Sequence, residues 1–252
     1  PVAHQGGSLA NTLSVFIVSL AVILFGSTPA CAQWVQTNGP YGGWIAALAV
    51  TSDGAVFAGG DCGLYRSTNN GDFWEQVTHG LPPGKYVSNL AISRNGTIFA
   101  AAYNSVYRST DKGNSWQLAN SGLPTSQIYI LTIDGNDRIF VSLGTIGTNG
   151  GIFVSSNGGD SWTQIDNGLP QYTSMRSLVV NGSGHVFVGA SSGVYRSTDL
   201  GNSWNNINSG FKGTWINALT INSKGQIVAA LYDGLYRSIN NGDSWSRIGT
   251  AG

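Results

Sequence analysis

Glutamate and lysine are scarce in this chain of 252 residues, which has one glutamate, Glu75, and four lysines. Both residue types normally fill the exposed faces of amphipathic helices, so we expect few helices. Charge is scarce as well: 10% of the residues are charged, and 12 basic residues balance 12 acidic ones. A net charge of zero gives no electrostatic field that would attract nucleic acid, so nucleic acid is not an expected partner.

Paired cysteines and clustered histidines are also missing. The two cysteines are Cys31 and Cys62, and the three histidines are scattered along the chain. The sequence has no Gly-Lys-Ser/Thr phosphate loop and no Gly-x-Ser-x-Gly elbow. Since metal, nucleotide and nucleophile sites need such groupings, we expect no metal and no cofactor.

Glycine and tryptophan are abundant, with 36 and 8 copies, and 41% of the residues are hydrophobic. This composition favours many short strands joined by tight turns. The predicted fold class is therefore all-β.

The N-terminal segment is typical of an export signal. Residues 13–25 (LSVFIVSLAVILF) form an apolar run that is short for a membrane span, and small residues in an Ala-x-Ala pattern follow at Ala30-Cys31-Ala32. We expect residues 1–32 to be a signal peptide and the mature chain to begin at Gln33, without a membrane span. An alternative is a lipoprotein anchored through Cys31. The predicted location is secreted, periplasmic or at the cell surface.

Five eight-residue segments repeat along the rest of the chain, and we call them boxes one to five. They are residues 67–74, 109–116, 155–162, 197–204 and 238–245. Their first serines are 42, 46, 42 and 41 residues apart. Each repeat unit has three short apolar runs before its box and one after it, which predicts four strands a unit with the box as the hairpin between the third and the fourth.

The box pattern Ser-x-Asp-x-Gly-x-x-Trp resembles the Asp-box, or BNR, motif. The resemblance implies that residues 33–252 form one β-propeller domain of about five four-stranded blades, similar to sialidases, xyloglucanases and sortilin-like proteins. It implies no single activity, because such propellers include glycoside hydrolases, receptors and photosystem assembly factors.

The box residues are predicted to be structural, since the glycine allows a positive-φ turn and the tryptophan packs on the blade. These residues include Asp72, Trp74, Asp111, Trp116, Asp160, Trp162, Asp199, Trp204, Asp243 and Trp245. Every box carries one Asp and one Asn at its third and sixth positions, in either order. We expect these two side chains to lie close together, with the amide donating to the carboxylate; the alternative is a coincidence between interchangeable turn residues.

An additional copy of the post-box strand begins at Trp34. One interpretation is a ring that closes by pairing this strand with the last blade, which brings units one and five together. The alternative is that the five units are a fragment of a larger ring, because families with this motif more often have six or more blades.

The ligand-binding face is expected where the second-to-third loops and the blade-to-blade loops meet. Residues that vary between the repeats on this face are the candidate ligand-binding residues: Trp44, Asp61, Tyr86, Tyr103, Tyr129, Arg176, Trp215, Tyr232 and Asp233. Aromatic rings beside carboxylates suit a sugar, whose C–H surface stacks on the ring while its hydroxyls donate to the acids. The alternative is that these aromatic residues only pack at the seam between units one and five.

Three functions remain open. The first is a secreted, non-catalytic module that binds an extracellular polysaccharide or protein. The second is a glycoside hydrolase that uses Asp61 and Asp233, because such enzymes need two opposed carboxyls. The third is a structural surface or adhesion repeat. The arginine triad and Tyr/Glu pair that a sialidase-like site would need are missing.

Overall fold

The computed structural model describes residues 37, 39–40 and 43–249. The predicted signal peptide and Trp34 lie outside the described residues. The described chain is built from strands and turns, and it contains no helix long and apolar enough to cross a membrane.

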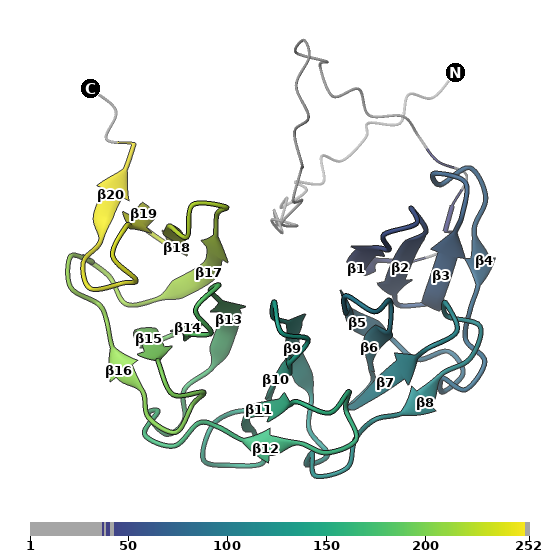
Figure 1. The fold of residues 1–252 in the computed structure, drawn as a ribbon, viewed down its shortest axis with the longest axis horizontal. Helices are drawn as coiled ribbons and strands as arrows, with labels where there is room; N and C mark the ends of the chain where they lie inside the picture. Colours follow the sequence, from purple (N-terminus) through teal and green to yellow (C-terminus); the bar gives the residue numbers. More distant parts are fainter. Residues whose placement is uncertain (1–36, 38, 41–42, 250–252) are drawn as a thin grey trace, which may run out of the picture. The chain divides into compact units, whose positions relative to one another are not determined.

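Twenty strands form five four-stranded antiparallel sheets, which we number as blades one to five (Figure 1). Within each sheet, the strands lie side by side in the order in which they occur in the chain. Blade one comprises β1 (Ile45–Val50), β2 (Val56–Gly60), β3 (Gly63–Ser67) and β4 (Glu75–Gln76). Blade two comprises β5 (Val87–Ile92), β6 (Ile98–Ala102), β7 (Ser105–Ser109) and β8 (Gln117–Leu118). Blade three comprises β9 (Ile128–Ile133), β10 (Ile139–Leu143), β11 (Gly151–Ser155) and β12 (Thr163–Gln164). Blade four comprises β13 (Met175–Val180), β14 (Val186–Ala190), β15 (Gly193–Ser197) and β16 (Asn205–Asn206). Blade five comprises β17 (Ile216–Ile221), β18 (Ile227–Leu231), β19 (Gly234–Ser238) and β20 (Ser246–Ile248). The predicted all-β fold with five four-stranded blades is confirmed.

The hydrophobic core lies between blades. Each of the four clusters of buried side chains occupies one junction between successive blades. At the first junction, for example, Phe57 and Leu64 of blade one pack against Ile98 and Trp116 of blade two. A blade therefore buries both faces only when it has a neighbour on each side.

The box tryptophans join each blade to the one before it. The indole N–H of Trp116 donates to the carbonyl oxygen of Val77 at 3.0 Å, and Trp162 makes the same bond to Ala119 at 2.9 Å. Trp204 and Trp245 repeat the bond to Ile165 and Ile207, both at 2.7 Å. Since all four side chains are buried, each bond satisfies a donor and an acceptor that water does not reach.

Inside each box, the first and third residues hold the turn. In box two, Ser109 Oγ accepts from the amide of Gly113, and Asp111 accepts from the amide of Ser115. The expected pairing of the third and sixth side chains is absent from boxes two to five as the structure describes them. The third side chain accepts from a turn amide in each of these boxes. In box four the sixth side chain, Asn202, donates to the backbone oxygen of Asp199 rather than to its carboxylate.

Arginines of three blades reach the sixth box residue of the following blade. Arg66 donates to Asn114, and Arg108 and Arg196 form ion pairs with Asp160 and Asp243. Each of these arginines also donates to the carbonyl oxygen of the fourth box residue. The sixth box residue therefore joins neighbouring blades in boxes two, three and five.

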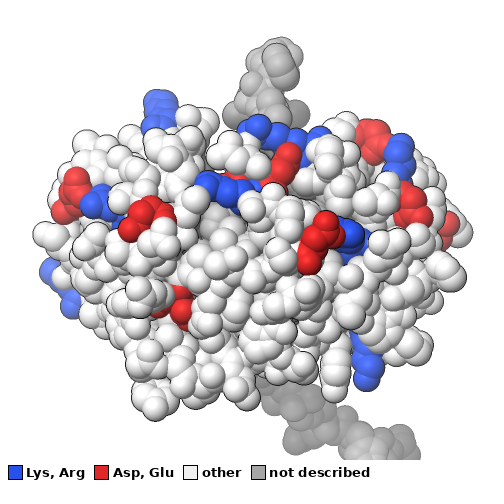
Figure 2. All heavy atoms as spheres, turned by 60° about the horizontal axis from the view of Figure 1, so that its bottom comes forward, with Lys and Arg blue, Asp and Glu red and all other residues white. Residues whose placement is uncertain are grey.

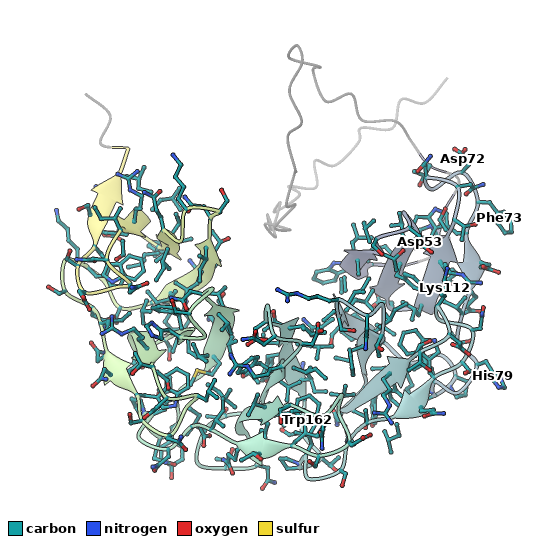
Figure 3. All side chains as sticks on the ribbon, in the orientation of Figure 1. Asp53, Asp72, Phe73, His79, Lys112 and Trp162 are labelled. Atoms are coloured by element: carbon teal, nitrogen blue, oxygen red, sulfur yellow. The ribbon has the colours of Figure 1, made fainter. Side chains whose placement is uncertain are left out.

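Charged groups on the surface lie mostly beside the opposite charge (Figure 2). Asp53, in the β1–β2 turn, pairs with Lys112 of box two at 2.8 Å, again across a junction (Figure 3). No broad area of one sign appears on the side that Figure 2 shows.

Blades one and five stand at the two ends of the series of blades (Figure 1). Strand contacts join β1 to β5, β5 to β9, β9 to β13 and β13 to β17, and no buried cluster links blade five with blade one among the described residues. Blade five already has its own fourth strand, β20, at the place where the additional N-terminal strand was expected to pair. The described residues therefore form no seam between units one and five.

Candidate ligand-binding face

One end of the blades gathers the variable residues, and we call it the loop face. It is formed by the loops between second and third strands and by the residues that lead into each first strand. Backbone bonds hold these segments together, since Asp61 N donates to Trp44 O and Tyr103 N donates to Tyr86 O. Each blade therefore presents a pair of side chains from two segments at this end.

A β-bulge near the start of each first strand adds a further side chain to the loop face. The strand pairing skips one residue in every blade, and the skipped residues are Ala46, Ser88, Tyr129, Arg176 and Asn217. A bulge redirects a side chain away from the regular pleat. The bulge therefore explains why this residue varies between the repeats, whereas the neighbouring residues of the first strand stay hydrophobic and pack in the core.

Exposed aromatic residues concentrate on this face. Among the described residues, seven of the eight exposed aromatic side chains belong to it, namely Trp44, Tyr86, Tyr103, Tyr129, Tyr172, Trp215 and Tyr232. The eighth, Phe73, lies in box one at the opposite end, on the outside of its blade (Figure 3). A concentration of exposed aromatic side chains on one face is more typical of a binding site than of packing.

The predicted site residues form two separate clusters. The first lies on blades one and two, where the backbone N–H of Trp44 donates to Asp61 Oδ2 at 3.3 Å. Burial, and secondarily the charge of Asp61, raise the pKa of Tyr86. In the same blade as Tyr86, the ammonium of Lys85 lies 4.4 Å from the ring centre of Tyr103.

The second cluster lies on blades four and five. The guanidinium of Arg176, the bulge residue of blade four, lies 4.7 Å from the ring centre of Trp215, which leads into blade five. Trp215, Tyr232 and Asp233 line a pocket of about 360 Å³ together with Lys212, Thr214 and Leu231. This pocket combines an aromatic wall with charged groups of both signs.

Hydrogen bonds from two residues of blade five fix the position of Asp233. The hydroxyl of buried Tyr236 donates to Asp233 Oδ2 at 2.7 Å, and this bond, with burial second, raises the pKa of Tyr236. Arg247 donates to the backbone oxygen of Asp233. The other carboxylate oxygen, Oδ1, is buried without a hydrogen-bond partner in the described chain. Asp233 therefore lines the pocket with a carboxylate whose position is fixed by its own blade.

The structure does not bring Asp61 and Asp233 together. Asp61 belongs to the blade-one cluster and Asp233 to the blade-five cluster, at opposite ends of the series of blades. Tyr129 stands between the two clusters on blade three. A two-carboxylate mechanism needs separations of about 5–10 Å, and no contact among the described residues supports such a pair.

Lys85, Lys212 and Tyr172 also lie on the loop face, but they were not among the residues predicted from the sequence. All three lie in blade-to-blade connections, shortly before a first strand, and two of them are among only four lysines in the chain. Their scarcity and shared position could have singled them out.

One other candidate feature carries a structural role. A second pocket of about 360 Å³ lies at the opposite end, between blades two and three, but its Arg108 and Asp137 already bond to neighbouring turns. No group of three or more His, Cys, Asp or Glu side chains that could hold a metal occurs within the described part of the chain.

Comparison with known proteins supports the fold. The DUF6242 beta propeller domain family matches residues 130–251, which cover blades three to five. The chain is a β-propeller. No curated protein shows significant similarity to it.

Solved structures resemble the propeller over most of its length. A GH74 xyloglucanase from Xanthomonas campestris has a TM-score of 0.66 at 18% identity, covering 79% of this chain and 38% of that one. The extracellular domain of BT4673 from B. thetaiotaomicron has a TM-score of 0.65 at 18% identity, covering 81% and 27%. YCF48 bound to D1 peptide has a TM-score of 0.65 at 17% identity, covering 84% and 70%. The propeller spans well under half the length of the first two, so the likeness concerns the fold.

Proposed function

We propose that this propeller is a secreted, non-catalytic module that binds an extracellular polysaccharide through the loop face of blades four and five. The observation that carries the proposal is the pocket lined by Trp215, Tyr232 and Asp233, with the Arg176 guanidinium against the ring of Trp215.

The chemistry of this pocket suits a sugar chain. The exposed faces of Trp215 and Tyr232 offer flat apolar surface for the C–H side of a pyranose ring. Lys212 supplies donors for ring and hydroxyl oxygens, and Asp233 supplies an acceptor for hydroxyl protons. The contact of the Arg176 guanidinium with the Trp215 ring restricts the indole before a ligand binds, which lowers the loss of side-chain entropy on binding.

The loop face is long as well as aromatic. Tyr129 on blade three and the cluster on blades one and two continue the row of exposed rings, which suits a polymer more than a single small molecule. Similar folds occur in a xyloglucanase and in a protein bound to a peptide, so a protein ligand is the principal competitor. Export rests on the N-terminal apolar run and on the resemblance to an extracellular domain.

A glycan array followed by calorimetry tests the proposal. Replacing Trp215 by alanine should weaken binding of the best glycan about tenfold or more, since a central aromatic contact contributes about 1–2 kcal/mol. Phe73→Ala is the matched control, because it removes an exposed aromatic ring from the opposite end and should leave the affinity unchanged.

Each alternative has its own result. Binding only to peptides on a parallel array would replace the polysaccharide by a protein ligand. Hydrolysis of a glycan that is abolished by Asp61→Asn or Asp233→Asn, with binding kept, would establish the hydrolase. An equal loss of binding in Phe73→Ala and Trp215→Ala would remove the site from the loop face.

A further inference from the structure

Ion pairs are distributed unevenly between the two ends of the blades. The described chain contains five of them, and each one involves a box, a first-to-second turn or the two strands that flank a box. None of the five involves a residue of the loop face, although that face carries charges of both signs. Basic and acidic side chains of the loop face therefore do not neutralise each other by direct contact.

Three basic side chains of the loop face contact aromatic rings or line the pocket instead of pairing with acids. Lys85 lies against the ring of Tyr103, Arg176 lies against the ring of Trp215, and Lys212 lines the pocket beside Trp215. No hydrogen bond or ion pair joins these three side chains to another residue in the described part of the chain. Because a cation on an aromatic ring keeps its N–H donors, all three can still bind an anion.

The carboxylates of the same face accept from neutral donors. Asp61 accepts from a backbone N–H, and Asp233 accepts from the hydroxyl of Tyr236. Asp233 and Lys212 line one pocket and yet form no ion pair among the described residues. Since Arg176 adds a second cation at this pocket, two positive charges stand beside one carboxylate. The excess positive charge attracts a negatively charged group of a ligand.

Both contacts between a cation and a ring lie at internal blades. Arg176 and Trp215 meet across the junction between blades four and five, which is packed by a buried cluster of its own. Lys85 and Tyr103 belong to blade two, which packs against blade one on one side and against blade three on the other. The two contacts are therefore set by neighbouring blades that the structure describes.

Backbone strain accompanies the exposed rings of this face. Tyr103 has a φ of 58° and is 62% exposed, and Tyr172 has a φ of 60° and is 76% exposed. A bulky side chain rarely adopts a positive φ, because its Cβ then crowds the following carbonyl oxygen. Burial does not offset the strain at either tyrosine. Strained, exposed residues of this kind are typical of ligand sites, so Tyr103 and Lys85 form a second candidate contact for a long ligand.

We propose that the polysaccharide bound by the loop face is acidic. A sugar ring stacks on Trp215, and its carboxylate or sulfate group pairs with Arg176 and Lys212 through charge-assisted hydrogen bonds. Lys85 beside Tyr103 binds a further anionic group of the same polymer. This inference rests on the proposed polysaccharide-binding function and narrows it, because a neutral glycan would leave all three cations without an anionic partner.

A comparison of charged and uncharged glycans tests the inference on the full chain. An array that holds neutral glycans together with polygalacturonate, alginate, hyaluronan and chondroitin sulfate should give its strongest signals for acidic chains. In calorimetry, the best binder should lose about tenfold in affinity when its charge is removed, and its affinity should fall as NaCl rises from about 20 mM to about 500 mM. A loss on carboxyl reduction identifies a carboxylate as the recognised group, and a loss on desulfation identifies a sulfate.

Charge-removing variants locate the contact. Arg176→Gln and Lys212→Gln should each weaken binding of the acidic glycan about threefold to tenfold, and Lys85→Gln should weaken binding of the long polymer by a similar factor. Arg176→Lys keeps the positive charge and should retain most of the affinity. The matched control is Lys224→Gln, because Lys224 is an exposed lysine in the β17–β18 turn of blade five, at the opposite end from the loop face. It should leave the affinity unchanged.

The outcomes separate this inference from the proposed function. If the strongest ligand is neutral and is bound equally well by wild type, Arg176→Gln and Lys212→Gln, the inference is overturned, whereas the proposed function stands as long as Trp215→Ala weakens binding. Equal losses in Lys212→Gln and Lys224→Gln would show a general effect of net charge and would also overturn it. Binding to no glycan at all would overturn both.

Discussion

The indole bond between blades gives a sharp test of how the propeller is held together. Trp116 is 4% exposed and packs between blades one and two, and its N–H donates to Val77 O. Trp116→Ala removes both the ring and the bond, and it should destabilise the protein by about 3–5 kcal/mol. For a domain of this size, the melting temperature should fall by roughly 6–20 °C.

Phenylalanine variants separate the bond from the packing. Trp116→Phe keeps an aromatic ring but leaves the buried carbonyl of Val77 without a donor, which should cost about 1–3 kcal/mol. In Trp74→Phe no such cost arises, because the Trp74 N–H has no acceptor among the described residues. Comparing each Phe variant with the Ala variant at the same position corrects for the different burial of the two rings.

Differential scanning calorimetry or thermal denaturation followed by circular dichroism measures these differences. An unchanged melting temperature for Trp116→Ala would show that the box tryptophan does not hold the junction. Equal hydrogen-bond costs in Trp116→Phe and Trp74→Phe would refute the role assigned to the indole bond.

Two further predictions concern the boxes. Hydrogen bonds from Ser115 and Ser203 lower the pKa of Asp111 and Asp199 from 3.8 to about 2. The two carboxylates therefore stabilise the fold fully above about pH 4, and this contribution is lost as the pH falls toward 2. A double Asp→Asn variant at these positions, which carries the residue type of Asn69 and Asn157, should show a smaller drop in melting temperature between pH 5 and pH 2. Gly113→Ala should destabilise the protein by about 2–4 kcal/mol, because its Cβ would meet the ring of Phe57 at a φ of +86°. The control is Gly96→Ala, which has a φ of +84° but open space around it and should cost only about 1 kcal/mol. Chemical denaturation measures both values, and equal losses of stability would contradict the packing argument.

The blade architecture was predictable because every repeat carries its own turn chemistry. The Ser109 and Gly113 pattern fixes a hairpin locally, and five copies at near-constant spacing leave one arrangement for twenty strands. The columns that vary between repeats could also be recognised in the sequence, since they stand out against the core columns, and their role in ligand binding stays a prediction.

Ring closure was not predictable from the same pattern. It depends on the angle between successive blades and on how many blades are present, and neither is written in a single repeat. The expected pairing of Asp and Asn within a box was wrong in boxes two to five because turn amides bond to the third residue first. The contact of Arg176 with Trp215 was missed because it crosses a junction and depends on a bulge.

The bulge at the start of each first strand has a practical consequence. Its residue stands outside the ladder of backbone bonds, so an exchange of side chain there leaves the strand register untouched. Five positions on one face therefore tolerate substitution, namely Ala46, Ser88, Tyr129, Arg176 and Asn217. A combinatorial library confined to these codons would sample new recognition surfaces while every member keeps the same scaffold.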